Sequence, residues 1–499
     1  MSAPLPNILL VMADQLTAFA LSAYGGRLTT TPVMDALAAR GHVFDAAYCP
    51  YPLCAPSRFA TMAGRLPSRI AAYDNGAEFP ASVPTFAHYL RRAGYFTAIS
   101  GKMHFVGPDQ LHGFEDRLTT EIYPADFSWT PDPDEVASAE RFGAGTSTVE
   151  NILDSGPMAR TMQIDYDEDV AHHTCREIFV RARTDDPRPF FITASFTQPH
   201  DPYVTTQRYW DAAGEAPPPT VPFVPLDQRD PHSRMLFDHY GQDTVTLGEA
   251  AIARARRAYA GMTRHIDDLL GAMVAALTEA GLLDNTLIIV ASDHGDMLGE
   301  RGMWYKKTLF EPAIRVPLIV AGPGVSAGRT ATPVSLLDLM PTLCDLAGAT
   351  PTTPMDGRSL APALRGDALP PVPIFVEHLD GGTAAPRVMV RDGDKKLILS
   401  EAYPPIFTDL AADLLELTLS QTPDPHLTWI AAETWDLAAL QAEKIANQRA
   451  RSVVRDALKQ GRQTPWATLA HAGERRLHTV RAGDRFPDVE RAGYLRYRP

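Results

Sequence analysis

The 499-residue sequence predicts an α/β fold, in which a large, mixed and mostly parallel sheet flanked by helices precedes a smaller C-terminal α+β subdomain. Two observations point to this fold. Short apolar runs bounded by turn residues recur along most of the chain, and helical patterns lie between them. After Pro371 the apolar runs instead follow one another closely, which is typical of antiparallel strands joined by turns.

Five apolar runs are predicted to be buried strands of the large sheet. Each run is apolar on both faces, as expected for strands that helices cover on both sides. Ligands of open α/β sheets bind beyond the carboxyl ends of the strands, so the residues that follow these runs are candidates for function. The runs are 7–13, 95–100, 189–196, 285–292 and 317–322.

The clearest helical pattern covers residues 251–285. Apolar side chains recur there at the spacing that places them on one face of a helix, and Gly281 is suited to end it. The recurring residues are Tyr259, Met262, Ile266, Leu269, Met273 and Leu277.

The C-terminal part begins with three short predicted strands, at 373–379, 387–393 and 395–401. A helix is predicted over 435–461, and a polar, arginine-rich tail follows it. The segment from Trp435 onward is typical of an arm exchanged between subunits, so we expect a homodimer or homotetramer. The predicted division of the chain is a large α/β domain at 1–370, a small subdomain with antiparallel strands at 371–430, and a C-terminal helix and arm at 431–499.

Composition and charge exclude several classes of protein. Acidic residues outnumber basic ones by 60 to 46, and no basic run stands out, which argues against nucleic acid as a partner. The N-terminus lacks the pattern of a secretory signal, and no apolar run reaches the roughly 20 residues that span a bilayer. We therefore expect a cytoplasmic protein without a membrane partner. Its four cysteines have no C-x-x-C spacing, which argues against a zinc ribbon or a redox pair.

Chemically reactive side chains follow four of the predicted strands. Asp14 and Gln15 follow the first strand, and the short sequences "GKMH", "QPHDP" and "SDHGD" follow three others. A single Asp or His at such a place is commonly a helix cap or a hydrogen-bonded loop residue. Four strand ends loaded in this way indicate a functional site instead.

These residues divide into two chemical groups. Asp14, Gln15, Asp293 and His294 offer mainly oxygen ligands, which suit a hard divalent cation. The second group can surround a tetrahedral oxyanion and move protons. A metal beside a cationic cage predicts transfer of a sulfuryl or phosphoryl group. The second group comprises Arg58, Lys102, His104, His200 and Lys306.

The segment "PLCAPSRFATMAG", residues 52–64, places a cysteine four residues before an arginine. A cysteine-dependent phosphatase would need the arginine six residues after the cysteine, where Ala60 stands. The run resembles the C-x-P-S-R signature of the formylglycine-dependent (type I) sulfatases. In that family a maturation enzyme oxidises the cysteine to Cα-formylglycine, and the resemblance implies the same conversion at Cys54. Pro56 and Arg58 belong to the motif that this enzyme recognises.

The resemblance covers the whole chain and is greatest to choline sulfatases. "AAYDNGAEF", "DPHS" and the long run at 101–132 are similar to that subfamily. The resemblance implies an alkaline-phosphatase/sulfatase-like fold, hydrolysis of a small-molecule sulfate ester, most of all choline sulfate, and a divalent metal. Calcium is the expected ion, with magnesium or manganese as alternatives. The implied metal ligands are Asp14, Gln15, Cys54, Asp293 and His294.

The resemblance also implies roles in the reaction. Cys54, as formylglycine, attacks sulfur and Arg58 orients it, while Asn75 and Lys102 help to hold the sulfate. His200 and Lys306 also contact the sulfate, and either can protonate the leaving alcohol. His104 helps to remove the proton that releases sulfate and restores the aldehyde.

The alcohol half of the substrate is predicted to contact Trp129, whose ring would face the quaternary ammonium in a cation–π contact. An ordinary packed tryptophan is the alternative for this residue. The sequence departs from choline sulfatases around Gly381 and Gly382, where a glutamate is expected to balance the ammonium charge. Here Asp380 or Glu377 would have to serve.

Two other functions stay open at this point. The same scaffold could act on aryl sulfates, or on phosphonate and phosphate diesters, because a cationic cage does not strictly separate sulfate from phosphate. A non-catalytic homologue could instead bind an anion through the cage while Cys54 stays a thiol.

Overall fold

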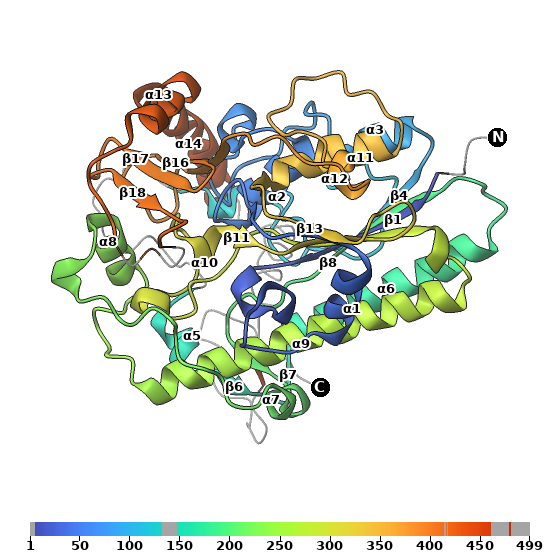
Figure 1. Cartoon of the computed structure of the whole chain (residues 1–499), viewed down its shortest axis with the longest axis horizontal. Helices are drawn as coiled ribbons and strands as arrows, with labels where there is room; N and C mark the ends of the chain where they lie inside the picture. Colours follow the sequence, from blue (N-terminus) through green and yellow to red (C-terminus); the bar gives the residue numbers. More distant parts are fainter. Residues whose placement is uncertain (1–4, 132–146, 414–415, 417, 461–478, 481–499) are drawn as a thin grey trace.

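The structure is a computed structural model of the chain, and it describes residues 5–131, 147–413, 416, 418–460 and 479–480. The predicted fold class is confirmed: a large mixed sheet lies between two layers of helices, and a small antiparallel sheet follows (Figure 1). The remaining residues of the predicted C-terminal arm, 461–478 and 481–499, lie outside the described residues.

The large sheet has eight strands, and its centre is parallel. β1 pairs in parallel with strands on both sides, and the next strand outward on one side, β4, is parallel as well. β12 and β2 are antiparallel to their neighbours nearer the centre, so this edge makes the sheet mixed. In spatial order the strands are β13 (Gly328–Thr330), β2 (His42–Phe44), β12 (Leu318–Ala321), β10 (Thr286–Ser292), β1 (Asn7–Ala13), β8 (Phe190–Ser195), β4 (Phe96–Gly101) and β5 (Asp116–Arg117).

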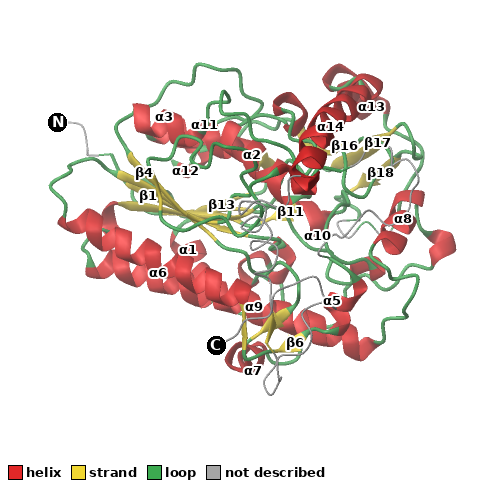
Figure 2. Cartoon of the chain, turned by 180° about the vertical axis from the view of Figure 1, so that it is seen from behind, coloured by secondary structure: helices red, strands yellow, loops and turns green. Residues whose placement is uncertain are grey.

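The apolar strands are covered on both faces, which explains why their sequences do not alternate with polar residues. In β1 the side chains of Ile8 and Leu10 belong to one hydrophobic core, while those of Leu9 and Val11 belong to the other. Figures 1 and 2 show the two helical layers. One contains α1 (Pro32–Arg40), α6 (Met162–Arg183) and α9 (Glu249–Glu279), and the other contains α2 (Cys54–Ala63), α3 (Phe86–Arg92), α11 (Leu339–Leu346) and α12 (Ala361–Leu364).

The predicted strands and the long helix correspond closely to observed elements. All five strands are present and no end is shifted by more than one residue, although the run at 317–322 became an antiparallel strand. Helix α9 ends at Glu279, and Gly281 follows with a φ of 69° that an L side chain rarely adopts. Five of the six predicted core positions of α9 are buried, and Leu269 is half-buried.

The C-terminal part contains more structure than the sequence predicted. Its sheet has a fourth strand, and a separate helix, α13, precedes the predicted one. The predicted helix itself begins at Leu437 and not at Trp435. These elements are β15 (Ile374–His378), β16 (Arg387–Asp392), β17 (Lys395–Ser400), β18 (Ile406–Asp409), α13 (Pro425–Thr434) and α14 (Leu437–Gln460).

Short elements connect the layers. The helices are α5 (Val149–Leu153), α7 (Gln207–Ala213), α8 (Pro231–His239) and α10 (Glu311–Ile314). A three-stranded sheet has the order β11 (Arg315–Val316), β3 (Ala47–Tyr48) and β14 (Val334–Ser335). Two further pairs are β6 (Gly156–Pro157) with β9 (Val204–Thr205), and β7 (Arg160–Thr161) with β19 (Thr479–Val480). None of the helices in the described part of the chain combines the length and apolar character needed to cross a membrane. All four cysteines are free.

Candidate active site

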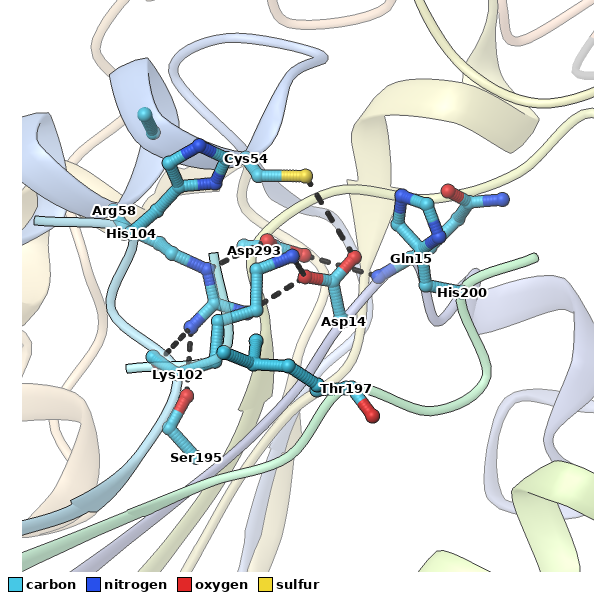
Figure 3. Close-up of polar contacts among 12 residues, drawn as sticks. Asp14, Gln15, Cys54, Arg58, Lys102, His104, Ser195, Thr197, His200 and Asp293 are labelled. Atoms are coloured by element: carbon cyan, nitrogen blue, oxygen red, sulfur yellow. Dashed lines mark hydrogen bonds and ion pairs between the residues drawn. The ribbon is translucent and has the colours of Figure 1, made fainter. Parts of the chain in front are cut away.

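The predicted site residues meet at the carboxyl edge of the central parallel strands. Asp14 follows β1 and Asp293 follows β10, while Lys102 follows β4. His200 lies five residues beyond the end of β8. The first residue of α2, Cys54, faces this edge, so strand ends and one helix N-terminus bring the groups together (Figure 3).

Four buried side chains form a group that fits a metal ion. The ligand atoms of Asp14, Cys54, Asp293 and His294 all lie within 4.8 Å of one another. The Cys54 Sγ is 3.3 Å from the His294 Nε2 and 3.8 Å from the Asp14 Oδ1. The His294 Nδ1 lies 3.0 Å from the Gly295 carbonyl and can donate to it, which leaves Nε2 free to coordinate. Burial also lowers the pKa of His294, so the ring is in its neutral, ligand form.

Arg58 holds the outer oxygen of each carboxylate. Its Nε donates to the Asp293 Oδ2 at 2.8 Å, and its Nη2 donates to the Asp14 Oδ2 at 3.1 Å (Figure 3). The Oδ1 atoms, in contrast, face the group of four ligands, where two anionic oxygens and a neutral imidazole suit a divalent cation. The donor set present therefore fits a metal, although it does not identify the ion.

Lys102 adds a second buried cation next to Asp14, with which its Nζ forms an ion pair. Burial by itself raises the pKa of Asp14, but the charges of Lys102, His200 and Arg58 hold that pKa well below its usual value. Burial lowers the pKa of Lys102 and its pairing with Asp14 raises it, with a net result well above the ordinary value. Both groups are therefore ionised at neutral pH.

Gln15 belongs to a different set of contacts from the four metal-suited residues. Its side-chain oxygen accepts from the Lys306 Nζ, and its Nε2 donates to the Asp296 Oδ2 at 2.6 Å. Its backbone N–H donates to the Asp293 Oδ1 at 3.0 Å. The metal-ligand role predicted for Gln15 stays a prediction, because in this arrangement its amide connects the metal side of the site to Lys306.

Lys306 and His200 form a connected pair. The Lys306 Nζ lies 2.6 Å from the His200 Nε2, and the His200 Nδ1 lies 2.7 Å from the Asp201 carbonyl. The Asp201 Oδ1 is 3.8 Å from the Lys306 Nζ. The ring can thus donate through Nδ1 and accept the ammonium proton through Nε2, an arrangement suited to proton transfer.

His104 is buried, and neither of its ring nitrogens has a hydrogen-bond partner among the described residues. Burial first, and then the charges of Lys102 and Arg58, lower its pKa well below the ordinary value, so the ring is a neutral base. Its ring stacks on Tyr123 at a centroid distance of 4.8 Å and meets the edge of Trp129 at 5.2 Å. A half-buried tryptophan thus lies directly beside the predicted base.

The other predicted substrate contacts are held from elsewhere. The Asn75 Oδ1 accepts from the backbone N–H of Ala55, so Asn75 caps α2 directly behind Cys54. Asp380 is fully buried against α14, where its Oδ2 accepts from Gln448 at 2.5 Å. Glu377 accepts from Ser68 and Trp435 and is equally buried.

Comparison with known families decides the identity of this site. A family model described as Sulfatase matches residues 6–349. The chain belongs to the sulfatase family. Sulfatases generally use a divalent metal and a formylglycine, and the buried group of Asp14, Cys54, Asp293 and His294 lies where both would be needed. This sulfatase is a sulfuric ester hydrolase, so the reading as a non-catalytic homologue is wrong.

Sulfatases from other organisms are similar to this chain in sequence. The sulfatase is 42% identical to a choline-sulfatase from Rhizobium meliloti (strain 1021), over 97% of this chain and 99% of the relative. It is 29% identical to an arylsulfatase from Clostridium perfringens, over 83% of this chain and 89% of the relative. In structure it resembles the phosphonate monoester hydrolase of Agrobacterium radiobacter, with a TM-score of 0.66, 23% identity, and coverage of 88% of this chain and 96% of that one.

Sequence reasoning did not single out several residues of the sulfatase site. Asp201 and Asp296 lie inside the motifs "QPHDP" and "SDHGD", so position relative to the strand ends could have identified them. Ser195, which accepts from the Arg58 Nη1 at 2.6 Å, is the last residue of β8. Tyr123 carries no such signal, yet the Lys102 Nζ lies 4.3 Å from the centre of its ring.

Proposed function

We propose that this sulfatase hydrolyses choline sulfate to choline and sulfate. The observation that carries the proposal is an aromatic surface beside the cationic cage: the rings of Tyr123 and Trp129 lie 5.0 Å apart, and both contact His104. A trimethylammonium group binds favourably to such aromatic faces. The 42% identity to a choline-sulfatase over nearly the whole chain supports the same substrate.

The sulfate half is proposed to bind among the cations at the strand ends. Lys102, His200 and Lys306 supply positive charge or hydrogen-bond donors, and Asn75 contributes its amide N–H₂ group because its oxygen already caps α2. Arg58 fixes the two carboxylates and through them the position of residue 54. Donors arranged in advance around developing negative charge are commonly the largest single contribution to catalysis.

Residue 54 is proposed to be Cα-formylglycine, formed from Cys54 by a maturation enzyme. When present, that group supplies a hydrated aldehyde as the nucleophile, and a bound divalent cation, calcium in our proposal, stabilises negative charge on it. The proposed ligands are Asp14, Asp293, His294 and residue 54, with Gln15 as a further candidate.

Two proton transfers are assigned to residues of this chain. The pair of Lys306 and His200 protonates the oxygen of the leaving alcohol, since their nitrogens lie 2.6 Å apart and a proton can pass between them. His104 accepts the proton whose removal releases sulfate, because its ring is neutral and its nitrogens have no partner among the described residues. The acid and the base are thus separate groups.

A second candidate function is hydrolysis of aryl sulfates or of phosphonate and phosphate diesters. The specific observation in its favour is the structural likeness to phosphonate monoester hydrolases from two organisms, Agrobacterium radiobacter and Silicibacter pomeroyi. A cage of lysines and histidines holds any tetrahedral oxyanion, so these esters are expected as slower substrates.

We also propose a cellular and structural context. The chain is divided into a catalytic domain at 1–370, a small subdomain at 371–430, and a C-terminal helix and arm at 431–499 that contributes to a homodimer or homotetramer. The four-stranded antiparallel sheet, β15 to β18, begins at Ile374 and supports the boundary after residue 370. A cytoplasmic location is part of the same proposal.

The experiment that tests the substrate compares two esters of equal size. Choline sulfate and 3,3-dimethylbutyl sulfate differ only in a nitrogen that carries a positive charge. The proposal expects kcat/KM for choline sulfate to be at least about thirtyfold higher, as a desolvated cation–π contact of roughly 2 kcal/mol predicts. Equal values for the two esters would contradict choline as the substrate and favour the second candidate.

A further inference from the structure

Helix α14 has a polar buried face, which is unusual for a helix that packs against a domain. Lys444, Gln448, Arg451 and Arg455 recur at helical spacing, and each is at most 7% exposed. Long charged side chains are almost never buried unless they are paired. The apolar side chains of Val453, Val454 and Leu458 are instead exposed on this helix. The contacts of this polar face, and not an apolar stripe, therefore hold α14 against the rest of the protein.

Two of these side chains hold a carboxylate next to the sulfate site. Arg451 donates to both oxygens of Asp74, at 2.9 and 2.6 Å, and Gln448 donates to the Asp74 Oδ2 at 3.1 Å. A two-pronged arginine–carboxylate contact fixes direction as well as distance. Asp74 directly precedes Asn75, whose side chain caps α2 behind Cys54.

The same face holds the turn that carries Trp129. Arg455 donates to the Thr130 carbonyl at 3.0 Å, and Arg451 donates to the Thr130 Oγ1 at 3.4 Å. Thr130 is adjacent to Trp129, the last residue of the short helical turn η4 (Phe127–Trp129). The described part of α14 thus contacts the residue next to Asn75 and the residue next to Trp129 with a single guanidinium.

The third loop held by α14 is the turn at Asp380. Gln448 donates to the Asp380 Oδ2 at 2.5 Å, and the Lys444 Nζ lies 3.6 Å from the Asp380 Oδ1. Lys444 also donates to the Leu379 carbonyl at 3.2 Å. The Gln448 amide therefore connects two buried carboxylates, Asp74 and Asp380, that are distant in sequence.

The loops are also packed directly on each other. A Cβ atom at Gly76 would lie 2.6 Å from the backbone nitrogen of Thr130 and 2.7 Å from the carbonyl carbon of Trp129. The loop at 74–76 thus touches the backbone of the turn at 127–130. Both views place α14 beside the small sheet, on the side of the large sheet that carries α2 (Figures 1 and 2). A displacement of one loop must move the other.

Simple anchoring of a C-terminal helix does not require this chemistry. Replacing a buried ionic group by well-packed apolar residues is often neutral or stabilising. Ionic contacts, in contrast, specify the geometry of the groups that they join. The contacts of α14 go to residues adjacent to Asn75 and Trp129, and not to the apolar core of the small sheet alone.

We propose that α14 is a positioning element of the active site, and that Arg451 is the positioning residue that places Asn75 and Trp129 relative to Cys54 through Asp74 and Thr130. The part of this inference that concerns Trp129 rests on the proposed preference for choline sulfate. The part that concerns Asn75 depends only on sulfate ester hydrolysis.

The test compares three variants of the full-length protein. Arg451→Met removes both contacts, Arg451→Lys keeps the charge without the two-pronged geometry, and Arg449→Met changes an exposed arginine of the same helix. Rates are measured per formylglycine-containing site, quantified by mass spectrometry, and well below the unfolding temperature. The substrates are choline sulfate and a small aryl sulfate.

Arg451→Met is expected to lower kcat/KM about 100-fold for choline sulfate and about tenfold for the aryl sulfate, because small misplacements of substrate-contacting groups cost factors of this size. Arg451→Lys should retain part of the activity that Arg451→Met loses on each ester, and Arg449→Met should have the same kcat/KM as the unmutated protein. A purely structural role would lower the unfolding temperature and leave both values of kcat/KM per active site unchanged.

The outcomes separate this inference from the proposed substrate. If Arg451→Met stays within twofold of Arg449→Met for both esters, the positioning role is wrong even where choline sulfate is preferred. If the unmutated enzyme shows no preference for choline sulfate but Arg451→Met lowers both rates about equally, the substrate proposal fails and the positioning of Asn75 stands. Should Arg451→Met not fold, Arg451→Lys decides by the same criterion, with any drop beyond twofold supporting the role.

Discussion

The sulfate side and the alcohol side of the active site are held in different ways. Asp14, Lys102 and Asp293 directly follow strands of the central sheet and are paired with each other or with Arg58. Trp129 and Asp380, in contrast, lie on loops, and both loops are tied to α14. The comparison teaches that the metal-suited carboxylates and Lys102 are built into the sheet, whereas Asn75 and the groups expected to choose the alcohol depend on a distant helix.

The strongest way to test the sulfate side is to remove its nucleophile. Cys54→Ala should lower kcat by roughly 10³-fold or more on every ester, because no residue can replace the group formed at position 54. The change should leave the fold intact, since Cys54 is a small side chain at the start of a helix. Steady-state kinetics on choline and aryl sulfates measure the loss.

Cys175→Ala is the matched control, because Cys175 is half-buried on α6, away from the site. Mass spectrometry of the peptide containing residue 54 should find formylglycine in active preparations. Fully active protein that contains only cysteine at position 54 would disprove the proposed nucleophile.

Next in size is the loss of the metal-suited group. Asp293→Asn should reduce kcat roughly 10²–10³-fold, since it removes one oriented charge from the site and leaves Arg58 with Asp14 alone. Chelation of the metal in the unmutated enzyme should have a similar effect on turnover. Kinetics with and without added calcium, magnesium or manganese measure both effects and identify the ion that restores activity.

Asp284→Asn, an exposed aspartate just before β10, provides the control. Chelator-treated protein with undiminished turnover, shown by elemental analysis to be free of metal, would contradict a catalytic cation at this site.

The alcohol side should respond selectively. Trp129→Ala should reduce kcat/KM for choline sulfate roughly thirtyfold and the rate on a small aryl sulfate much less, because the lost cation–π contact serves only the ammonium group, although Trp129 also packs beside His104. Trp429→Ala serves as the control, since that tryptophan is 60% exposed on α13. A uniform loss on both esters would show that Trp129 supports the cage and does not select the alcohol.

The smallest expected effect concerns a cation near the alcohol side. The Lys307 Nζ lies 2.9 Å from the His239 Nε2, and the Lys307 side chain packs against Gly382. Burial, followed by the charge of Lys306, lowers the pKa of Lys307 to about 8, although Asp380 and Asp201 oppose this. Lys307 is therefore charged below pH 8 and repels a trimethylammonium group, and it becomes neutral above that pH.

Lys307→Met should accordingly raise the preference for choline sulfate over 3,3-dimethylbutyl sulfate at pH 7 by roughly fivefold, about 1 kcal/mol for a half-buried charge. In the unmutated enzyme the same preference should increase between pH 7 and pH 9, and the variant should lose this pH dependence. Lys395→Met, at an exposed lysine of β17, is the control. A preference that is independent of pH in both proteins would refute the role of Lys307.

The comparison also explains what the sequence could predict. The residues of the sulfate side could be predicted because the carboxyl ends of parallel strands converge, so Asp14, Lys102 and Asp293 could be grouped from their positions alone. Arg58 and Cys54 could be predicted from one short sequence motif. The prediction of these residues needed no knowledge of how distant loops pack.

The alcohol side required contacts that no local pattern encodes. Arg451 and Asp74 are 377 positions apart, and an arginine on a helix is ordinarily exposed to solvent. The same limit applies to the fold: α13 and β18 were not predicted, and the run at 317–322 gave an antiparallel strand, because pairing direction depends on the partner strand β10. The role of Asp380 beside the substrate stays a prediction, and the contacts of its carboxylate with Gln448 and Lys444 depend on the docking of α14, which no local pattern encodes.

The burial of Cys54 limits the time at which another enzyme can modify this residue. The residue is 2% exposed, at the first position of α2 facing the strand ends, so the catalytic groups of another enzyme cannot reach its sulfur in the folded protein. The proposed conversion to formylglycine would therefore have to take place on the newly made chain, before the central strands close over residue 54. On this proposal the fraction of active molecules depends on the rate of modification relative to the rate of folding, and a chain that folds first would stay inactive for as long as it stays folded.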